Sequence, residues 1–151
     1  MARRAVPVTT MAGSGKALVH EKRIEVRWRD MDAFGHVNNA VFLTYLEEVR
    51  DEWLEGALAG AGDPMGFVLA GVTIRYRRPL TQGDDTIIAR CWPVKLGRSS
   101  IHTRESLETL QGEVAAQAES VIVAIDRDTG RARPLAEAER SAIERTITRL
   151  R

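Results

Sequence analysis

Residues 27–50 read RWRDMDAFGHVNNAVFLTYLEEVR, and the change of pattern inside this stretch decides the fold. At its start, residues 24–28 alternate between apolar and charged side chains, which is the period of a half-buried strand. From Asn38 to about Leu58 apolar side chains recur at helical spacing. The stretch therefore predicts a strand, a polar loop of sequence DMDAFGHVNN and then a long amphipathic helix.

The predicted helix has one broad apolar face and one acidic face. The apolar face carries Val41, Phe42, Tyr45, Leu46, Val49 and Trp53, whereas the opposite face carries Glu47, Glu48, Asp51, Glu52 and Glu55. A face this broad must be buried against another element.

Four β-rich segments follow the helix, at residues 67–79, 86–96, 100–110 and 114–126. They are separated by the turn sequences TQGDD, GRSS and QGE, which favours antiparallel pairing because parallel neighbours need long crossovers. After Pro134 a final amphipathic helix is expected, with Leu135, Ala138, Ile143, Ile147 and Leu150 on its apolar side. We predict an α+β fold in which a curved antiparallel sheet wraps around the long helix. The sheet edges would be covered by forming a homodimer with a continuous sheet, or a dimer of dimers.

Length and composition set the outer limits. A length of 151 residues predicts a single domain, placed at 21–151. Residues 1–20 are expected to form a flexible leader ahead of it. A net charge of +1 favours neither nucleic acid nor an anionic membrane as a partner, and no apolar run approaches the roughly 20 residues of a membrane span. Cys91 is the only cysteine, so no disulfide framework is expected and a reducing, cytoplasmic location is the default.

A metal site is not expected in the polar loop. Asp30, Asp32 and Gly35 match three positions of a calcium-binding EF-hand loop, but Phe34 and Val41 occupy positions that require oxygen ligands. A transition-metal site would lack a further ligand. We therefore expect no metal and no cofactor.

The loop has a structural interpretation and a chemical one. Asn38 or Asn39 at the start of the helix can cap its free N–H groups, with Gly35 making the tight turn. The same N–H groups and the partial positive charge of the helix end can also polarise a carbonyl and stabilise an oxyanion. A nearby aspartate can then act as general base or as nucleophile. A thioester suits this equipment, because a thiol with a pKa of about 8.5 leaves without a strong general acid.

Residues 22–127 resemble the hotdog-fold acyl-CoA thioesterases of the 4-hydroxybenzoyl-CoA thioesterase type, and most of all the bacterial long-chain acyl-CoA branch. The resemblance rests on DMDAFGHVNNA with its acidic helix, on VTIRYRRPLTQGDD, and more weakly on LGRSSI and AESVIVAID. It implies a hotdog fold and hydrolysis of an acyl-CoA to free acid and coenzyme A. It also implies that Asp32 is the catalytic carboxylate, general base or nucleophile, and that the turn from His36 to Asn39 supplies the carbonyl-polarising N–H groups.

Other site residues are expected around this centre. His36 is a candidate for orienting water or substrate, or for ordering the loop, and Phe34 stands where related carrier-protein thioesterases have an asparagine. Asp30 is expected to end the strand in solvent. Substrate contacts are expected from Val37, Asn38, Asn39 and Tyr45. Phosphate contacts are expected from Arg75, Arg77, Arg78 and Arg98, as arginine forks suit phosphate.

Two rivals share the fold. One is a non-catalytic protein that binds or senses acyl thioesters, and the other is an enoyl-CoA hydratase, for which no matching Asp/His constellation stands in the sequence. Fold alone does not decide between them, because function depends on the site. The acyl group, and coenzyme A versus a carrier protein, are left open by the sequence.

Overall fold

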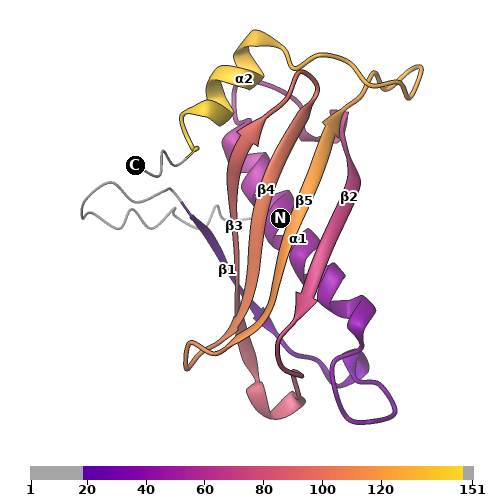
Figure 1. Cartoon of the computed structure of the whole chain (residues 1–151), viewed down its shortest axis with the longest axis vertical. Coiled ribbons are helices and arrows are strands. Elements are labelled where there is room, and N and C mark those ends of the chain that lie inside the picture. Colours follow the sequence, from indigo (N-terminus) through magenta and orange to yellow (C-terminus); the bar gives the residue numbers. More distant parts are fainter. Residues whose placement is uncertain (1–18, 148–151) are drawn as a thin grey trace, which may run out of the picture.

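The computed structural model describes residues 19–147, which form one curved antiparallel sheet, a long helix and a short C-terminal helix (Figure 1). The sheet order is β1-β3-β4-β5-β2. The strands are β1 (His20–Glu25), β2 (Phe67–Tyr76), β3 (Thr86–Leu96), β4 (Ser100–Thr109) and β5 (Val114–Ala124), and the helices are α1 (Asn39–Ala57) and α2 (Glu137–Glu144). Residues 1–18 of the expected leader and Leu150 of the expected last helix lie outside the described residues. His20, the last residue of that leader, is already part of β1 and pairs with Cys91.

The helix predicted from the opening stretch is confirmed. Asn38 is its N-cap and Leu58 its C-cap, and its buried side chains include Phe42, Tyr45 and Leu46. α1 lies chiefly over β3, with β1 and β4 beside it, and Figure 1 shows the sheet curving around it. The side chains of β3, β4 and β5 fit this arrangement, since buried and more exposed residues largely alternate along them and the buried ones face the core.

A buried ion pair ties the helix to the sheet. Arg50 Nη1 of α1 donates to Glu105 Oε1 of β4 at 3.0 Å, and both side chains are almost wholly buried. Thr103 Oγ1 and Ser120 Oγ also donate to the Glu105 carboxylate, at 2.9 and 2.8 Å. Burial of charge costs free energy unless the charged groups are hydrogen-bonded, and here the carboxylate accepts from all three neighbours.

The position of β2 corrects the simple order expected from the turns. β2 does not pair with β3, the next strand in sequence, but with β5 at the far edge of the sheet. The TQGDD segment, which contains a 3-10 turn at Gln82–Asp84, leads the chain across to the other side of the sheet instead of closing a hairpin. β2 is therefore an edge strand.

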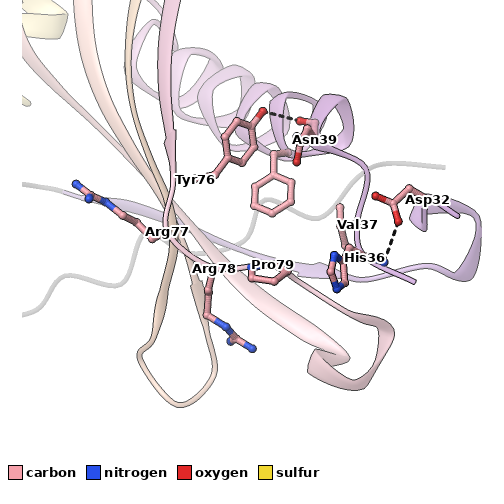
Figure 2. Close-up of a pocket in the computed structure, with 9 residues that line it drawn as sticks. Asp32, His36, Val37, Asn39, Tyr76, Arg77, Arg78 and Pro79 are labelled. Atoms are coloured by element: carbon pink, nitrogen blue, oxygen red, sulfur yellow. Dashed lines mark hydrogen bonds between the residues drawn. The ribbon is translucent and has the colours of Figure 1, made fainter. Parts of the chain in front are cut away.

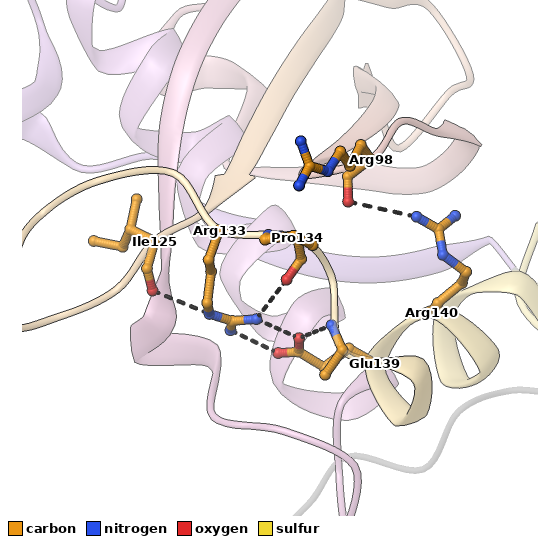
Figure 3. A network of polar contacts seen from close by, with 7 residues as sticks. Arg98, Ile125, Arg133, Pro134, Glu139 and Arg140 are labelled. Atoms are coloured by element: carbon orange, nitrogen blue, oxygen red, sulfur yellow. Dashed lines mark hydrogen bonds and ion pairs between the residues drawn. The ribbon is translucent and has the colours of Figure 1, made fainter.

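The last helix is also shorter than expected. α2 ends at Glu144, Leu135 precedes it, and Ala138 is exposed while Ala142 and Ile143 are buried. Figure 3 shows how it is held: Glu139 accepts from both terminal nitrogens of Arg133, at 2.7 and 2.9 Å, and also from the backbone N–H of Ala136 at 2.8 Å. The position of α2 thus depends on a polar anchor as well as on its apolar side chains.

Candidate active site

The polar loop is held by backbone hydrogen bonds on both sides. Asp32 N donates to His36 O at 2.7 Å and Gly35 N donates to Asp32 O at 3.1 Å, which closes a tight turn. Gly35 has φ +75°, a conformation that favours glycine. Val37 N donates to Leu80 O at 2.7 Å, so the loop is also joined to the segment that follows β2.

The Asp32 carboxylate is half-buried, and only one of its two oxygens accepts hydrogen bonds. Its Oδ1 accepts from Phe34 N at 2.8 Å and from His36 N at 3.1 Å. Between residues 19 and 147 no donor reaches its Oδ2. One oxygen therefore fixes the carboxylate on the loop while the other is open to a water molecule or a substrate.

The start of α1 leaves one backbone donor open. Asn38 Oδ1 caps Ala40 N at 2.8 Å, and Asn38 N donates to Asp30 O at 2.9 Å. Of the four N–H groups from His36 to Asn39, three have acceptors, and only Asn39 N has none within the described part of the chain. This donor lies at the positive end of the helix dipole.

A pocket of about 280 Å³ joins Asp32 to this helix start. It is lined by Asp32, His36, Val37, Asn39, Phe42, Tyr76, Arg77, Arg78 and Pro79, most of which Figure 2 labels. The rings of Phe42 and Tyr76 pack edge to face with their centroids 5.1 Å apart, and Tyr76 Oη donates to Asn39 O at 2.9 Å. The pocket thus has a polar end at the loop and an apolar wall beside the helix.

Two residues of this lining, Tyr76 and Pro79, were not among those singled out from the sequence. The alternation of β2 already placed Tyr76 on the inner face of the sheet, which is the signal that could have found it. Pro79 comes to the pocket because Val37 N donates to Leu80 O, a contact between distant segments that no local pattern reveals.

Asp30 corrects an expectation, because it is 4% exposed and does not end the strand in solvent. Tyr45 Oη donates to Asp30 Oδ2 at 2.6 Å, and the Arg27 guanidinium donates to both carboxylate oxygens at 3.2 Å. Burial alone would raise the pKa of Asp30, but the hydrogen bonds from Tyr45 and Arg27 outweigh it and hold the pKa below its usual value. Burial, and then the bond to Asp30, raise the pKa of the Tyr45 phenol. Asp30 thus anchors the base of the loop to α1.

The remaining expected site residues are scattered. Val37, Asn39, Arg77 and Arg78 line the pocket with Asp32 and His36, whereas Asn38 acts as the helix cap. Tyr45 is fully buried and faces Asp30, outside the pocket lining. Arg75 lies on β2 outside the pocket. Arg98 lies in the turn between β3 and β4 near α2. Its carbonyl oxygen accepts from Leu135 N at 2.9 Å and from Arg140 Nη2 of α2 at 3.5 Å, the second of which Figure 3 draws.

Two further findings concern residues 19–147. No group of three or more histidine, cysteine, aspartate or glutamate side chains is placed to hold a metal ion. None of the helices in that range combines the length and apolar character needed to cross a membrane.

The family follows from this fold and site. Residues 26–143 match the model of the thioesterase-like superfamily. The chain belongs to this superfamily, and the protein is an enzyme of the thioesterase class with the hotdog fold.

Individual relatives agree with this membership. The long-chain acyl-CoA thioesterase FadM of Escherichia coli is 31% identical over 130 residues, which cover 84% of this chain and 98% of the relative. A chloroplastic acyl-acyl carrier protein thioesterase of Arabidopsis thaliana is 32% identical over 82 residues, 50% of this chain and 42% of that protein. A Thermus thermophilus thioesterase solved with coenzyme A and zinc is similar in structure, with a TM-score of 0.74, 36% identity, and coverage of 83% of this chain and 92% of that one.

Proposed function

We propose that the protein hydrolyses acyl-CoA thioesters, with Asp32 as the catalytic carboxylate. The observation that carries the proposal is that the open Oδ2 of Asp32 and the open N–H of Asn39 belong to residues lining one pocket. The substrate class rests on the relatives, because FadM acts on acyl-CoA and covers most of this chain.

In the proposed reaction the thioester carbonyl oxygen accepts a hydrogen bond from Asn39 N, where the helix dipole stabilises the developing oxyanion. Asp32 takes a proton from water as the water oxygen attacks the carbonyl carbon. The carbon–sulfur bond then breaks, and coenzyme A leaves as a thiolate that is reprotonated. Direct attack by Asp32, which would form a mixed anhydride before hydrolysis, uses the same geometry. His36 lines the pocket and would orient the water or the substrate.

Cys91 does not offer an alternative nucleophile. It is fully buried on β3, and burial raises the pKa of its thiol well above the usual value. A cytoplasmic location fits a chain whose single cysteine is a free buried thiol.

We propose a homodimer joined along β2 as the active form. β2 is a ten-residue edge strand with Val68 and Leu69 exposed, and it ends at Tyr76 in the pocket wall. Pairing of two such strands would form the continuous sheet expected from the sequence and would bring a second subunit next to each pocket. A dimer of dimers would leave this contact unchanged.

The deciding experiment measures free-thiol release from acyl-CoAs of increasing chain length, and from an aromatic acyl-CoA, by wild type and Asp32→Asn. We expect turnover by wild type and a loss of about a hundredfold or more in the variant, the range of general acid–base catalysis. Asp126→Asn is the matched control. Asp126 also accepts two backbone N–H groups, from Asp128 and Thr129, but in an exposed turn away from the pocket.

Equal turnover by wild type and Asp32→Asn would contradict the assignment of Asp32. If wild type bound acyl-CoA, shown by a rise in melting temperature, and left the thioester intact, the protein would be an acyl-thioester binder or sensor.

A further inference from the structure

Tyr76 lines the pocket, yet the proposed reaction gives it no step. It is the last residue of β2, and its backbone is held in the sheet by pairing with Ala116 of β5 and by the hydrogen bond from Arg77 N to Ala115 O at 2.8 Å. α1 lies chiefly over β3, with β1 and β4 beside it, whereas β2 forms the opposite edge of the sheet from β1. Tyr76 therefore reaches the helix from a fixed strand end on another side.

The hydroxyl of Tyr76 contacts the first residue of α1. Tyr76 Oη donates to Asn39 O at 2.9 Å, a bond drawn in Figure 2. In an α-helix that carbonyl oxygen already accepts from the N–H four residues on, so the helix backbone does not need the phenol as a partner. Tyr76 is also 42% exposed, so water can take the place of the hydroxyl with a modest loss of stability. What the bond does fix is the position of Asn39, the residue whose N–H has no acceptor between residues 19 and 147.

The ring of Tyr76 contacts the same helix three residues later. It meets the ring of Phe42 edge to face, with the centroids 5.1 Å apart and the ring planes at 71°. Phe42 is almost fully buried, so the core sets its position. Residues three apart lie on one face of a helix. The hydroxyl and the ring thus hold two neighbouring points of the first turn of α1, which resists both sliding and rotation of that turn.

The loop holds the same helix start from the other side. Asn38 N donates to Asp30 O at 2.9 Å, and Val37 N donates to Leu80 O at 2.7 Å. These bonds fix the residues before Asn39 and belong to the loop that carries Asp32. Tyr76 completes the support, because it holds Asn39 itself from the sheet.

We propose that Tyr76 is a positioning residue of the thioesterase site, which sets the place of the Asn39 N–H relative to the Asp32 carboxylate. The proposal rests on the proposed function and deepens it. A donor to a developing oxyanion works at about 2.7–3.1 Å from that oxygen. A displacement of about 1 Å in an active site can lower the rate about a hundredfold, so a contact of little value for folding can be of large value for turnover.

Tyr76 acts through Asn39 and not on the reacting atoms. Its hydroxyl proton is directed at Asn39 O, away from a thioester bound between Asn39 N and Asp32. Burial raises the pKa of the Tyr76 phenol, so the group stays neutral throughout the pH range in which an aspartate serves as base.

The first test uses Tyr76→Phe, which removes the hydroxyl and keeps the ring against Phe42. We expect kcat for acyl-CoA hydrolysis to fall about tenfold, or about 1.4 kcal/mol, with KM unchanged, because the lost effect belongs to the transition state. Tyr76→Leu also removes the ring contact, and kcat should fall about a hundredfold. Thr146→Val is the matched control, because Thr146 Oγ1 likewise donates to a carbonyl at a helix end, Ile143 O of α2 at 2.8 Å, and its loss should leave kcat and KM unchanged.

The pH profile separates positioning from acid catalysis. The kcat profile of Tyr76→Phe should keep the wild-type shape and be lower by the same factor at each pH. Loss of a basic limb together with the phenol would overturn the proposal and make Tyr76 a general acid. An unchanged kcat would overturn it as well, and a raised KM at unchanged kcat would make Tyr76 only a wall of the pocket.

The second test does not depend on turnover. Val41 N and Phe42 N donate to Asn38 O at 2.8 and 3.4 Å, so hydrogen exchange at these amides reports on the first turn of α1. We expect faster exchange there in Tyr76→Phe, with the last turn of α1 unchanged. Equal exchange in variant and wild type would overturn the proposal. Faster exchange in the variant of a protein that hydrolyses no acyl-CoA would refute the proposed function and leave Tyr76 as the residue that holds the helix start.

Discussion

Asp30 and Asp32 are separated by one residue but have opposite surroundings. Asp30 is buried and accepts from Tyr45 and Arg27, whereas Asp32 is half-buried and keeps one oxygen open. Asp30 also holds the far end of the loop that carries Asp32, because Asn38 N donates to Asp30 O where the loop enters α1. Asp30 thus fixes the base of a loop whose tip presents the proposed catalytic carboxylate.

Tyr45→Phe tests this anchor. The change removes the only phenol that donates to the buried Asp30 carboxylate, so we expect the free energy of unfolding to fall by about 1–3 kcal/mol. Urea unfolding would measure it. Tyr76→Phe is the comparison, because Tyr76 is 42% exposed and its hydroxyl donates to the carbonyl oxygen of Asn39 at the start of α1. This change should lower the free energy of unfolding by less than about 1 kcal/mol. Equal costs would show that Asp30 does not depend on Tyr45.

The lowered pKa of Asp30 predicts a specific acid dependence. A carboxyl with a folded pKa below its unfolded value of about 3.9 stabilises the protein above that value. The stabilisation is lost as the pH falls through the folded pKa. Urea unfolding between about pH 6 and 3 should therefore show a shallower loss of stability in Asp30→Asn than in wild type. Parallel curves for the two proteins would contradict the role given to this carboxylate.

Local contacts were predictable at the residue scale, and distant ones were not. Asn38 caps the N–H of Ala40, two residues away, and the sequence position was enough to limit the cap to Asn38 or Asn39. Asp30 meets Tyr45 fifteen residues later, and Arg50 meets Glu105 fifty-five residues later. Such pairs depend on how α1 lies on the sheet, and a single sequence contains no record of that.

Among the elements, α1 and α2 differ in what holds them. α1 buries a broad apolar face over the sheet, and its bounds matched the periodic pattern closely because that pattern and the burial have the same cause. α2 has eight residues, too few to be stable alone, and depends on the ion pair between Glu139 and Arg133. The apolar periodicity beyond Glu144 predicted a longer helix, because pattern alone does not show where tertiary contacts stop.

Glu139→Gln should therefore loosen α2. The buried Glu139 carboxylate receives both Arg133 nitrogens and the Ala136 N–H, so the variant should lose about 1–3 kcal/mol of local stability. Hydrogen exchange of the α2 amides measures this loss directly, as faster exchange with α1 unchanged. Glu137→Gln is the control in the same first turn, since Glu137 is exposed. Similar exchange in both variants would mean that the helix dipole, not the ion pair, holds α2.

Across the whole molecule, the two edges of the sheet are unlike. β1 is six residues long with the sequence HEKRIE, and its charged side chains protect it from pairing. β2 is ten residues long and leaves Val68 and Leu69 43% and 46% exposed. The sequence predicted a dimer with a continuous sheet but not which edge would form it, because the assignment of β2 to the far edge comes from its pairing with β5.

The exposed leucines of the chain provide a matched test of that edge. Leu69 of β2 and Leu110 of the turn after β4 are 46% and 45% exposed. Replacing either one with lysine should therefore have a similar effect on the stability of a single subunit. If two chains pair along β2, Leu69→Lys places two like charges near the interface and should shift the sedimentation profile toward monomer, whereas Leu110→Lys should not. Thioesterase activity should fall with the dimer fraction, because the pocket wall at Tyr76 continues from the same strand. A Leu69→Lys protein that stays dimeric and active would move the interface to another surface.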